Sequence, residues 1–268
     1  MPPHTTFSPI TFTSPPPWHG PLQPNQKLNL VDRLFEDKIK GPESFAARDG
    51  YLYTGLMNGM IVRIDPEDLS IESVARIGRE ACQEQHQEQK CGRPLGLAFT
   101  RAGKLLVCDA VFGFYKLDLE KKEEENRIRE KREQDRVEYT PLLTPDMEIG
   151  GLQHQVYNSL ALASDDETVY LTVSSTRFAL SDSLFEIMGD SSGRVIKYNL
   201  RTKEVTVLVS DINFANGIAL DPSEDFLLYC ETGRVRVHKL YLRGQRAGTS
   251  EVLVDNLPGM PDNIRWLE

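Results

Sequence analysis

Five residues with oxygen-bearing side chains stand at the beginnings of short predicted strands that recur along the chain. They are Glu43, Asn158, Asn216, Asp262 and Asn263. Carboxylate and amide oxygens are the donors that a hard cation such as Ca²⁺ prefers, with roughly six to eight of them around the ion. Each residue also has an ordinary explanation, because Asn before Gly and Asp or Asn after Pro commonly form turns. Their recurrence at equivalent places suggests a shared site.

The elements that would position these residues are β-hairpins. The clearest one covers residues 213–232, with predicted strands Gly217–Asp221 and Phe226–Glu231 joined by a Pro-Ser-Glu-Asp turn. An Asn216-Gly217 pair, which is unfavourable within a strand, stands at its beginning. Hairpins of this kind follow one another from Gly41 onward, so the sequence predicts an all-β fold.

The hairpins group into units of four strands. The first residues of successive units lie 46 to 63 positions apart, counted between Glu43, Leu95, Asn158, Asn216 and Asp262. Four-stranded units of about 40 to 50 residues are typical of β-propeller blades, whereas a β-sandwich has no four-strand period. We therefore predict a β-propeller of about four blades, followed by one strand of a further blade in residues 260–268.

Composition excludes several classes of protein. The chain has 268 residues, of which 40% are hydrophobic and 26% charged, and its net charge is -9. This acidity speaks against nucleic acid as the main partner, because phosphate binding requires a basic surface. The sequence has no apolar run of transmembrane length and no signal-peptide pattern at its N-terminus, so we expect no membrane segment in this chain.

Three segments differ in composition from the hairpins. Residues 1–24 are rich in Pro, Ser and Thr and predict a disordered leader before the propeller of residues 25–268. Residues 27–39 have a helix-like apolar spacing and predict either a short amphipathic helix or an irregular packing segment. Residues 120–138 carry acidic and basic side chains in nearly equal number, which favours a solvated insertion over an interaction surface.

The four cysteines fall into two groups. Cys82 and Cys91 bracket a short polar loop, where a disulfide would rigidify the connection. Zinc is the alternative, although His86 alone supplies too few additional ligands. Cys108 and Cys230 lie in apolar predicted strands, where a free Cys is usually a small buried residue rather than a nucleophile.

Several ordered motifs resemble one known family. The segments are GPES, KCGRPLGL, LLVCDAVFGFYKLD, SSGRVIKYNLRTKEVTVLV, FANGIALDPSEDFLLYCET, RVHKLYLRG and LPGMPDNIR. They resemble the strictosidine synthase-like family and are most similar to its animal branch, the adipocyte plasma membrane-associated protein and hemomucin type. The resemblance runs from Pro21 to Arg265, which is nearly the whole chain.

This resemblance implies a six-bladed β-propeller, related in architecture to paraoxonases and gluconolactonases. With about four blades and one strand, the chain is expected to form an incomplete propeller. The resemblance also implies a disulfide between Cys82 and Cys91, and hence a luminal or extracellular setting in a family of membrane-associated glycoproteins. Animal members usually carry a transmembrane helix where this chain has its Pro-rich leader.

The resemblance further implies that Glu43, Asn158, Asn216, Asp262 and Asn263 are ligands of a calcium ion on the propeller axis. Two carboxylates among them would balance the charge of the ion. Asn158 matches least well, because a Ser follows it where the family usually has Asp.

Three functions are compatible with such a site. The first is a calcium-dependent hydrolase of esters or lactones with weak arylesterase-like activity, in which Asp262 is a ligand or a nucleophile and the substrate is a small molecule. Asp109 stands where paraoxonases carry one of their assisting histidines. The second, the synthase reaction, is not expected, because the family's general-base Glu lies beyond Glu268. The third is a non-catalytic surface or binding propeller with a structural calcium ion, whose protein partner the sequence does not identify.

Overall fold

The computed structural model describes residues 11–12, 14–15, 17–20, 23–27, 29–79, 88–119, 139–182, 187 and 189–266. Much of the predicted leader, residues 1–24, and all of the predicted insertion, residues 120–138, lie outside the described residues. Both assignments therefore stay predictions.

Four antiparallel sheets of four strands each make up the described fold, which confirms the all-β prediction. Blade 1 comprises β1 (Phe45–Arg48), β2 (Tyr51–Gly55), β3 (Met60–Ile64) and β4 (Ile71–Arg76). Blade 2 comprises β5 (Pro94–Phe99), β6 (Leu105–Asp109), β7 (Gly113–Leu117) and β8 (Tyr139–Leu143). Blade 3 comprises β9 (Val156–Leu162), β10 (Thr168–Ser175), β11 (Gly193–Asn199) and β12 (Val205–Ile212). Blade 4 comprises β13 (Ala215–Leu220), β14 (Phe226–Glu231), β15 (Arg236–Tyr241) and β16 (Ser250–Val254).

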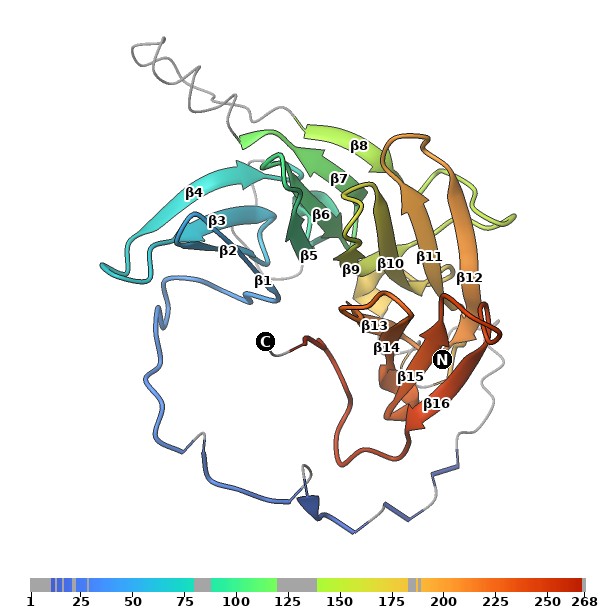
Figure 1. Ribbon diagram of the computed structural model, residues 1–268. Coiled ribbons are helices and arrows are strands. Elements are labelled where there is room, and N and C mark those ends of the chain that lie inside the picture. The colour runs from blue at the N-terminus through green and yellow to red at the C-terminus, as the bar shows by residue number, and fades with distance from the viewer. Residues whose placement is uncertain are drawn as a thin grey trace.

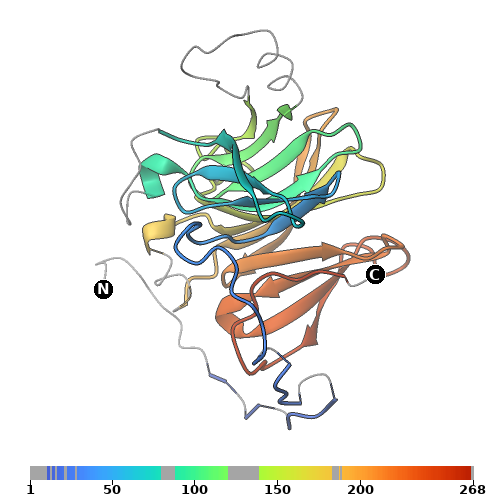
Figure 2. The same cartoon turned by 90° about the vertical axis from the view of Figure 1, so that its left-hand side faces the viewer.

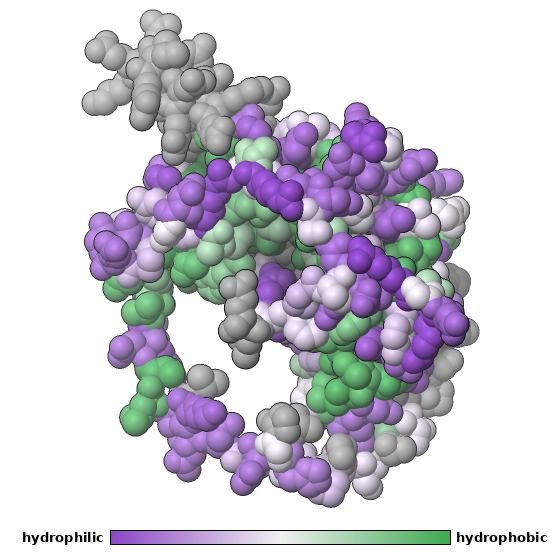
Figure 3. Space-filling model, in the orientation of Figure 1, coloured by the Kyte–Doolittle hydropathy of each residue, from purple (hydrophilic) through white to green (hydrophobic). Residues whose placement is uncertain are grey.

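The blades stand side by side in an arc around a central axis, with the first strand of each blade innermost (Figures 1 and 2). Consecutive inner strands touch, since β1 contacts β5, β5 contacts β9 and β9 contacts β13. The four blades do not close into a ring (Figure 1), and the space-filling view in the same orientation shows a hollow beside their inner strands (Figure 3). This is the incomplete propeller that the sequence predicts.

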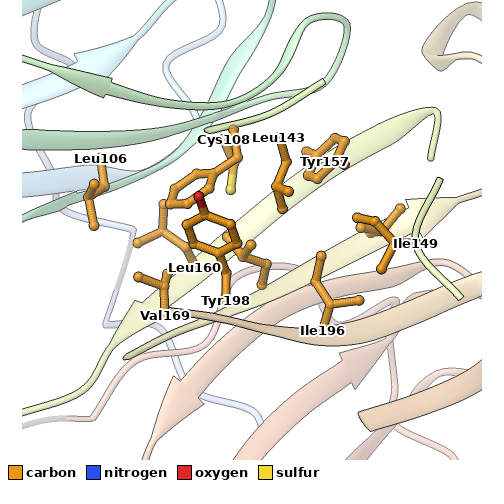
Figure 4. Packing of buried hydrophobic residues seen from close by; sticks show 12 residues of the cluster. Leu106, Cys108, Leu143, Ile149, Tyr157, Leu160, Val169, Ile196 and Tyr198 are labelled. Carbon is orange, nitrogen blue, oxygen red and sulfur yellow. The ribbon is translucent and has the colours of Figure 1, made fainter. Parts of the chain in front are cut away.

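Apolar side chains fill the space between consecutive blades. Every residue of β6 is buried, because both faces of this sheet pack against a neighbouring blade. Between blades 2 and 3, the rings of Phe114 and Tyr198 meet edge to face with 5.7 Å between their centres. Cys108, Leu143 and Tyr157 belong to the same cluster (Figure 4). Burial between blades explains why the inner strands are nearly continuous apolar runs.

Polar bonds also join each blade to the next. The hydroxyl of Ser44 donates to the backbone oxygen of Leu95, and the hydroxyl of Ser174 donates to the backbone oxygen of Ala215 at 2.7 Å. Gly96 permits the close approach of β5 to β9, since a Cβ there would lie 2.8 Å from the backbone oxygen of Asn158. The inner strands are therefore held in fixed register around the axis.

The hairpin at residues 213–232 differs from its prediction in one respect. Strand β13 begins at Ala215, so Asn216 and Gly217 lie within the strand rather than before it. The pairing with β14 is irregular between Ala215 and Ile218, and this irregularity accommodates the Asn-Gly pair. The prediction that the strand starts at Gly217 is wrong for this reason.

The prediction of one strand of a further blade is also wrong. Residues 261–266 form no strand, although they run beside β13. They meet it through a 3.1 Å bond from the Gly217 amide to the Asp262 carbonyl. A Cβ at Gly217 would lie 2.4 Å from that same oxygen, so glycine is what allows the contact.

Residues 29–39 contain turns and bends rather than a helix, so the irregular packing segment is the alternative that holds. Phe35 and Asp37 have a φ of 61°, which is incompatible with a right-handed helix. Phe35 and Ile39 pack on the buried Leu56, Val62 and Ile64 of blade 1. The segment thus covers the edge of the arc.

No helix in the described part of the chain is long and apolar enough to cross a membrane.

The cysteines behave as two groups. Cys108 and Cys230 are free and buried, and burial raises the pKa of the Cys230 thiol to about 12. Neither thiol is therefore suited to act as a nucleophile at neutral pH. Cys91 is buried at the end of α1 (Glu88–Cys91), whereas Cys82 lies outside the described residues. The predicted disulfide between Cys82 and Cys91 stays a prediction.

Candidate functional site at the inner-strand entrances

The amide of Asn158 is held in one orientation by its neighbour Ser174. Its Nδ2 donates to the Ser174 hydroxyl at 3.0 Å, and that hydroxyl donates in turn to the carbonyl of Ala215. Since the hydroxyl proton is already used, Ser174 can only accept from Asn158, so the nitrogen must face it. The Oδ1 of Asn158 then points elsewhere, and it is buried with no hydrogen-bond partner in the part of the chain that the structure describes.

Asn216 presents a second oxygen of the same kind on the adjacent inner strand. The residue is 5% exposed, and its Oδ1 is also buried without a hydrogen-bond partner among the residues described. A buried amide oxygen without a donor is costly and uncommon in folded proteins. Two of them at the equivalent ends of β9 and β13 indicate a place for a positively charged group.

Glu43 lies just before β1 of blade 1, at the other end of the arc from Asn216. Its Oε1 accepts a 3.0 Å bond from Nδ2 of Asn263, and its Oε2 is 3.7 Å from the guanidinium of Arg93. Burial raises the pKa of the Glu43 carboxyl, and the negative charge of nearby Asp262 raises it further. Asn263 and Arg93 act in the opposite direction. Two carboxylates that repel one another are an arrangement that a bound cation would relieve.

A chain of contacts links the segments that carry the five predicted residues, and Glu43 and Asn263 are the two of them whose side chains bond directly. Asn158 reaches Ala215 through Ser174, and Gly217 binds the backbone of Asp262. Asn263 then closes on Glu43. Asp262 and Asn263 are exposed, in contrast to the two buried asparagines.

Asp109, at the end of β6, has a structural environment. One of its carboxyl oxygens accepts the backbone amides of Val111 and Phe112, both at 2.9 Å, and the other accepts that of Arg93 at 2.7 Å. Complete burial nevertheless raises the pKa of Asp109 to about 6. Because both oxygens are occupied by backbone donors, the residue is suited to fixing the blade 2 loop rather than to moving a proton.

Sequence reasoning missed two side chains of this region. Ser174 orients Asn158, and Arg93 pairs with Glu43 and also donates to the Gly41 carbonyl at 2.6 Å. Arg93 belongs to the motif KCGRPLGL and directly precedes β5. Its position at the beginning of blade 2 could therefore have been noticed in the sequence. Ser174 lies in the second strand of a blade and carried no signal, because its role depends on the neighbouring blade.

The residues fit a calcium ion better than a transition metal. Across the described ranges, no group of three or more His, Cys, Asp or Glu side chains could hold a metal. The donors present are amide and carboxylate oxygens, which suit Ca²⁺. The two unpartnered Oδ1 atoms of Asn158 and Asn216 are the observation that supports this fit.

A cavity of about 590 Å³ lies directly beyond these residues along the inner strands. Its lining begins two positions after four of the predicted ligands, at Phe45, Leu160, Ile218 and Arg265. The volume is in the range of small-molecule sites. A ligand in this cavity would lie next to the candidate cation site.

Two family models match the sequence. The model described as "Strictosidine synthase" covers residues 158–245, and "Strictosidine synthase-like, N-terminal" covers residues 20–64. Adipocyte plasma membrane-associated protein from Bos taurus is 37% identical over 96% of this chain and 58% of its own length. Hemomucin from Drosophila melanogaster is 36% identical over 98% of this chain and 44% of its own length. The chain therefore spans about half the length of these relatives.

Solved structures support the fold. A gluconolactonase from Xanthomonas campestris has a TM-score of 0.58 and 14% identity, covering 85% of this chain and 67% of its own. A calcium-binding protein, regucalcin, from Agrobacterium tumefaciens has a TM-score of 0.55 and 13% identity, covering 82% and 61%. At these identities the likeness establishes the propeller architecture.

Proposed function

Because the chain belongs to the strictosidine synthase-like family, we propose that it forms the calcium-binding part of a propeller hydrolase acting on small esters or lactones. The observation that carries this proposal is the pair of buried, unpartnered amide oxygens of Asn158 and Asn216 beside the 590 Å³ cavity. The names of the structural neighbours, a gluconolactonase and a calcium-binding protein, support the same class.

Each predicted ligand has a distinct role in this proposal. Asn158 and Asn216 supply neutral oxygens from rigid strands, and Glu43, Asp262 and Asn263 supply the remaining donors from the opposite side. A calcium ion held there would polarise the carbonyl group of a substrate. Glu43 is positioned by Arg93, whose guanidinium partly offsets its charge.

Asp262 is the acidic residue of the site that solvent reaches, so it is the candidate for activating water or attacking the substrate. Its backbone oxygen is anchored to Gly217, which fixes the main chain next to β13. Phe45, Leu162 and Leu220 line the cavity and are at least partly exposed, so they offer an apolar surface to part of a substrate.

The test is hydrolysis of phenyl acetate and γ-butyrolactone by the purified chain, with calcium and with a chelator. We expect slow turnover that requires calcium and is lost in Asp262→Ala. Asp255→Ala, an exposed acidic residue beyond β16, is the matched control and should retain activity. Activity that survives chelation would contradict the proposal.

Calcium-dependent melting without any turnover would instead favour the non-catalytic binding propeller. The plasma-membrane association named for the relatives concerns those proteins, and we propose a luminal or extracellular setting for this chain on that basis.

A further inference from the structure

A second cavity, of about 520 Å³, lies between blades 3 and 4, away from the inner strands. It is bordered by the segment that follows β10, by the start of β11 and by the end of β12. Its charged and hydroxyl lining includes Arg177, Asp190, Ser192, Arg194, Asp211 and Arg234. Nothing in the proposed hydrolysis uses these residues.

The cavity carries more cationic than anionic groups, with three guanidiniums against two carboxylates. Arg177 pairs with Asp190 at 3.0 Å, but Arg194 donates to a neutral partner, the carbonyl of Ile149, at 2.8 Å. The positive charge of Arg194 helps burial to lower the pKa of nearby His154 to about 4, so this histidine is neutral and adds no charge.

Within the described part of the chain, the third guanidinium, that of Arg234, has one counter-ion, which it shares with other cationic groups. Its Nε is 3.9 Å from Glu231, and the same carboxylate is already bonded by Arg236 at 2.6 Å and by His238 at 2.7 Å. The Arg234 side chain is 36% exposed. It is therefore available to bind an anionic group that enters the cavity.

Asp190 supplies a hydrogen-bond acceptor beside these cationic groups. Its side chain is only 6% exposed, and while Oδ1 accepts from Arg177, the buried Oδ2 has no hydrogen-bond partner among the described residues. Its backbone oxygen accepts a 2.6 Å bond from Nδ2 of Asn213, so the residue is fixed in position. A buried carboxylate oxygen of this kind needs a donor, which a ligand can supply.

We propose that this cavity binds a small hydroxy carboxylate. Its hydroxyl group donates to Oδ2 of Asp190, and its carboxylate is bound by the guanidiniums of Arg234 and Arg177. The surplus positive charge favours such an anion over a zwitterion, which would bring an ammonium group with it. Hydrolysis of a lactone yields a molecule of this class, but the binding proposal does not depend on that activity.

Calorimetric titration of the chain with lactate, 3-hydroxybutanoate and 4-hydroxybutanoate tests the proposal. Butanoate and 1,4-butanediol are the controls that lack the hydroxyl or the carboxylate. We expect at least one hydroxy acid to bind about tenfold or more tightly than both controls. Binding of none of the hydroxy acids, or equal binding of the controls, would overturn it.

Variants locate the binding. Arg234→Ala should lower the affinity for the hydroxy acid by about tenfold. Arg177→Gln should lower it similarly and replaces the first variant if that one fails to fold. Arg201→Ala is the matched control, because Arg201 is an exposed arginine of blade 3 that pairs with Glu167 at the end of β11 remote from the cavity. Undiminished binding in both cavity variants would refute the site. Binding that persists in the presence of a chelator separates this cavity from the candidate calcium site.

Discussion

Replacing Ser174 by Ala should disturb the candidate calcium site without touching any of its ligands. The Ser174 hydroxyl accepts from Nδ2 of Asn158 at 3.0 Å and donates to the carbonyl of Ala215 at 2.7 Å. All three residues are buried. The substitution removes both bonds and frees the Asn158 amide to rotate.

The magnitude follows from the two bonds. Two net hydrogen bonds of about 1 kcal/mol each, with a buried donor and a buried acceptor left unpaired, predict a loss of roughly 2–4 kcal/mol in the free energy of unfolding. Residues that orient a metal ligand typically affect affinity by about 10- to 100-fold. We therefore expect calcium affinity to fall at least about tenfold.

Ser175→Ala is the matched control. Ser175 is equally buried, and its hydroxyl accepts the backbone amides of Arg177 at 2.9 Å and Phe178 at 2.8 Å, but it does not contact a predicted ligand. Urea unfolding in chelator should show a comparable loss in both variants, whereas calcium titration should show weakened binding in Ser174→Ala alone. Equal calcium affinity in the two variants would refute the reasoning.

Three further predictions concern the framework of the site. Asp109→Asn should flatten the dependence of stability on pH. Because the pKa of Asp109 is raised to about 6 in the folded state, about 3 kcal/mol of stability is present below pH 4 and is lost as pH rises through 6. Urea unfolding at pH 4.5 and 7.5 should show about 2 kcal/mol of this loss in the unaltered chain and less in the variant. Gly217→Ala should weaken calcium binding in a calorimetric titration, since its Cβ would meet the Asp262 carbonyl at 2.4 Å, whereas Gly259→Ala, with no atom within 4 Å, should not. Glu231→Gln should cost about 3 kcal/mol or more in urea unfolding, because it removes the buried partner of Arg236 and His238, whereas the exposed Glu167→Gln should have little effect. An unchanged pH profile, equal calcium affinity of the two glycine variants, or equal stability of the two glutamine variants would contradict the respective prediction.

The strand pattern was predictable because burial on both faces of a blade leaves apolar runs bounded by turn residues. Strands β10 and β14, for example, coincide with the segments TVYLTVSS and FLLYCE that the pattern indicates. Residues 261–266 could not be assigned correctly, because whether they pair as a strand depends on contacts with β13. The spacing of residues 27–39 did not indicate the observed structure for a similar reason. The conformation of this segment is set by its packing on blade 1, not by its local sequence.

The candidate site was predictable only in its ligand types. Recurrence at the blade entrances pointed to Asn158 and Asn216, and the structure adds that their oxygens lack partners. The support from Ser174 and Arg93 could not be predicted, because both act on residues of another strand or blade. The cavity between blades 3 and 4 carried no sequence signal at all, since its arginines are scattered over three segments.

The most direct test of the calcium site is a calorimetric calcium titration of Asn216→Leu beside the unaltered chain. Leucine has the same branching and the same number of side-chain heavy atoms as asparagine, although it is larger, and it lacks the unpartnered buried oxygen. The removal of that oxygen offsets the packing cost, so the variant should stay folded in chelator. We predict that the unaltered chain binds calcium and that the variant binds it at least about tenfold more weakly. Equal calcium binding by the two proteins, or none by the unaltered chain, would contradict the assignment of this site.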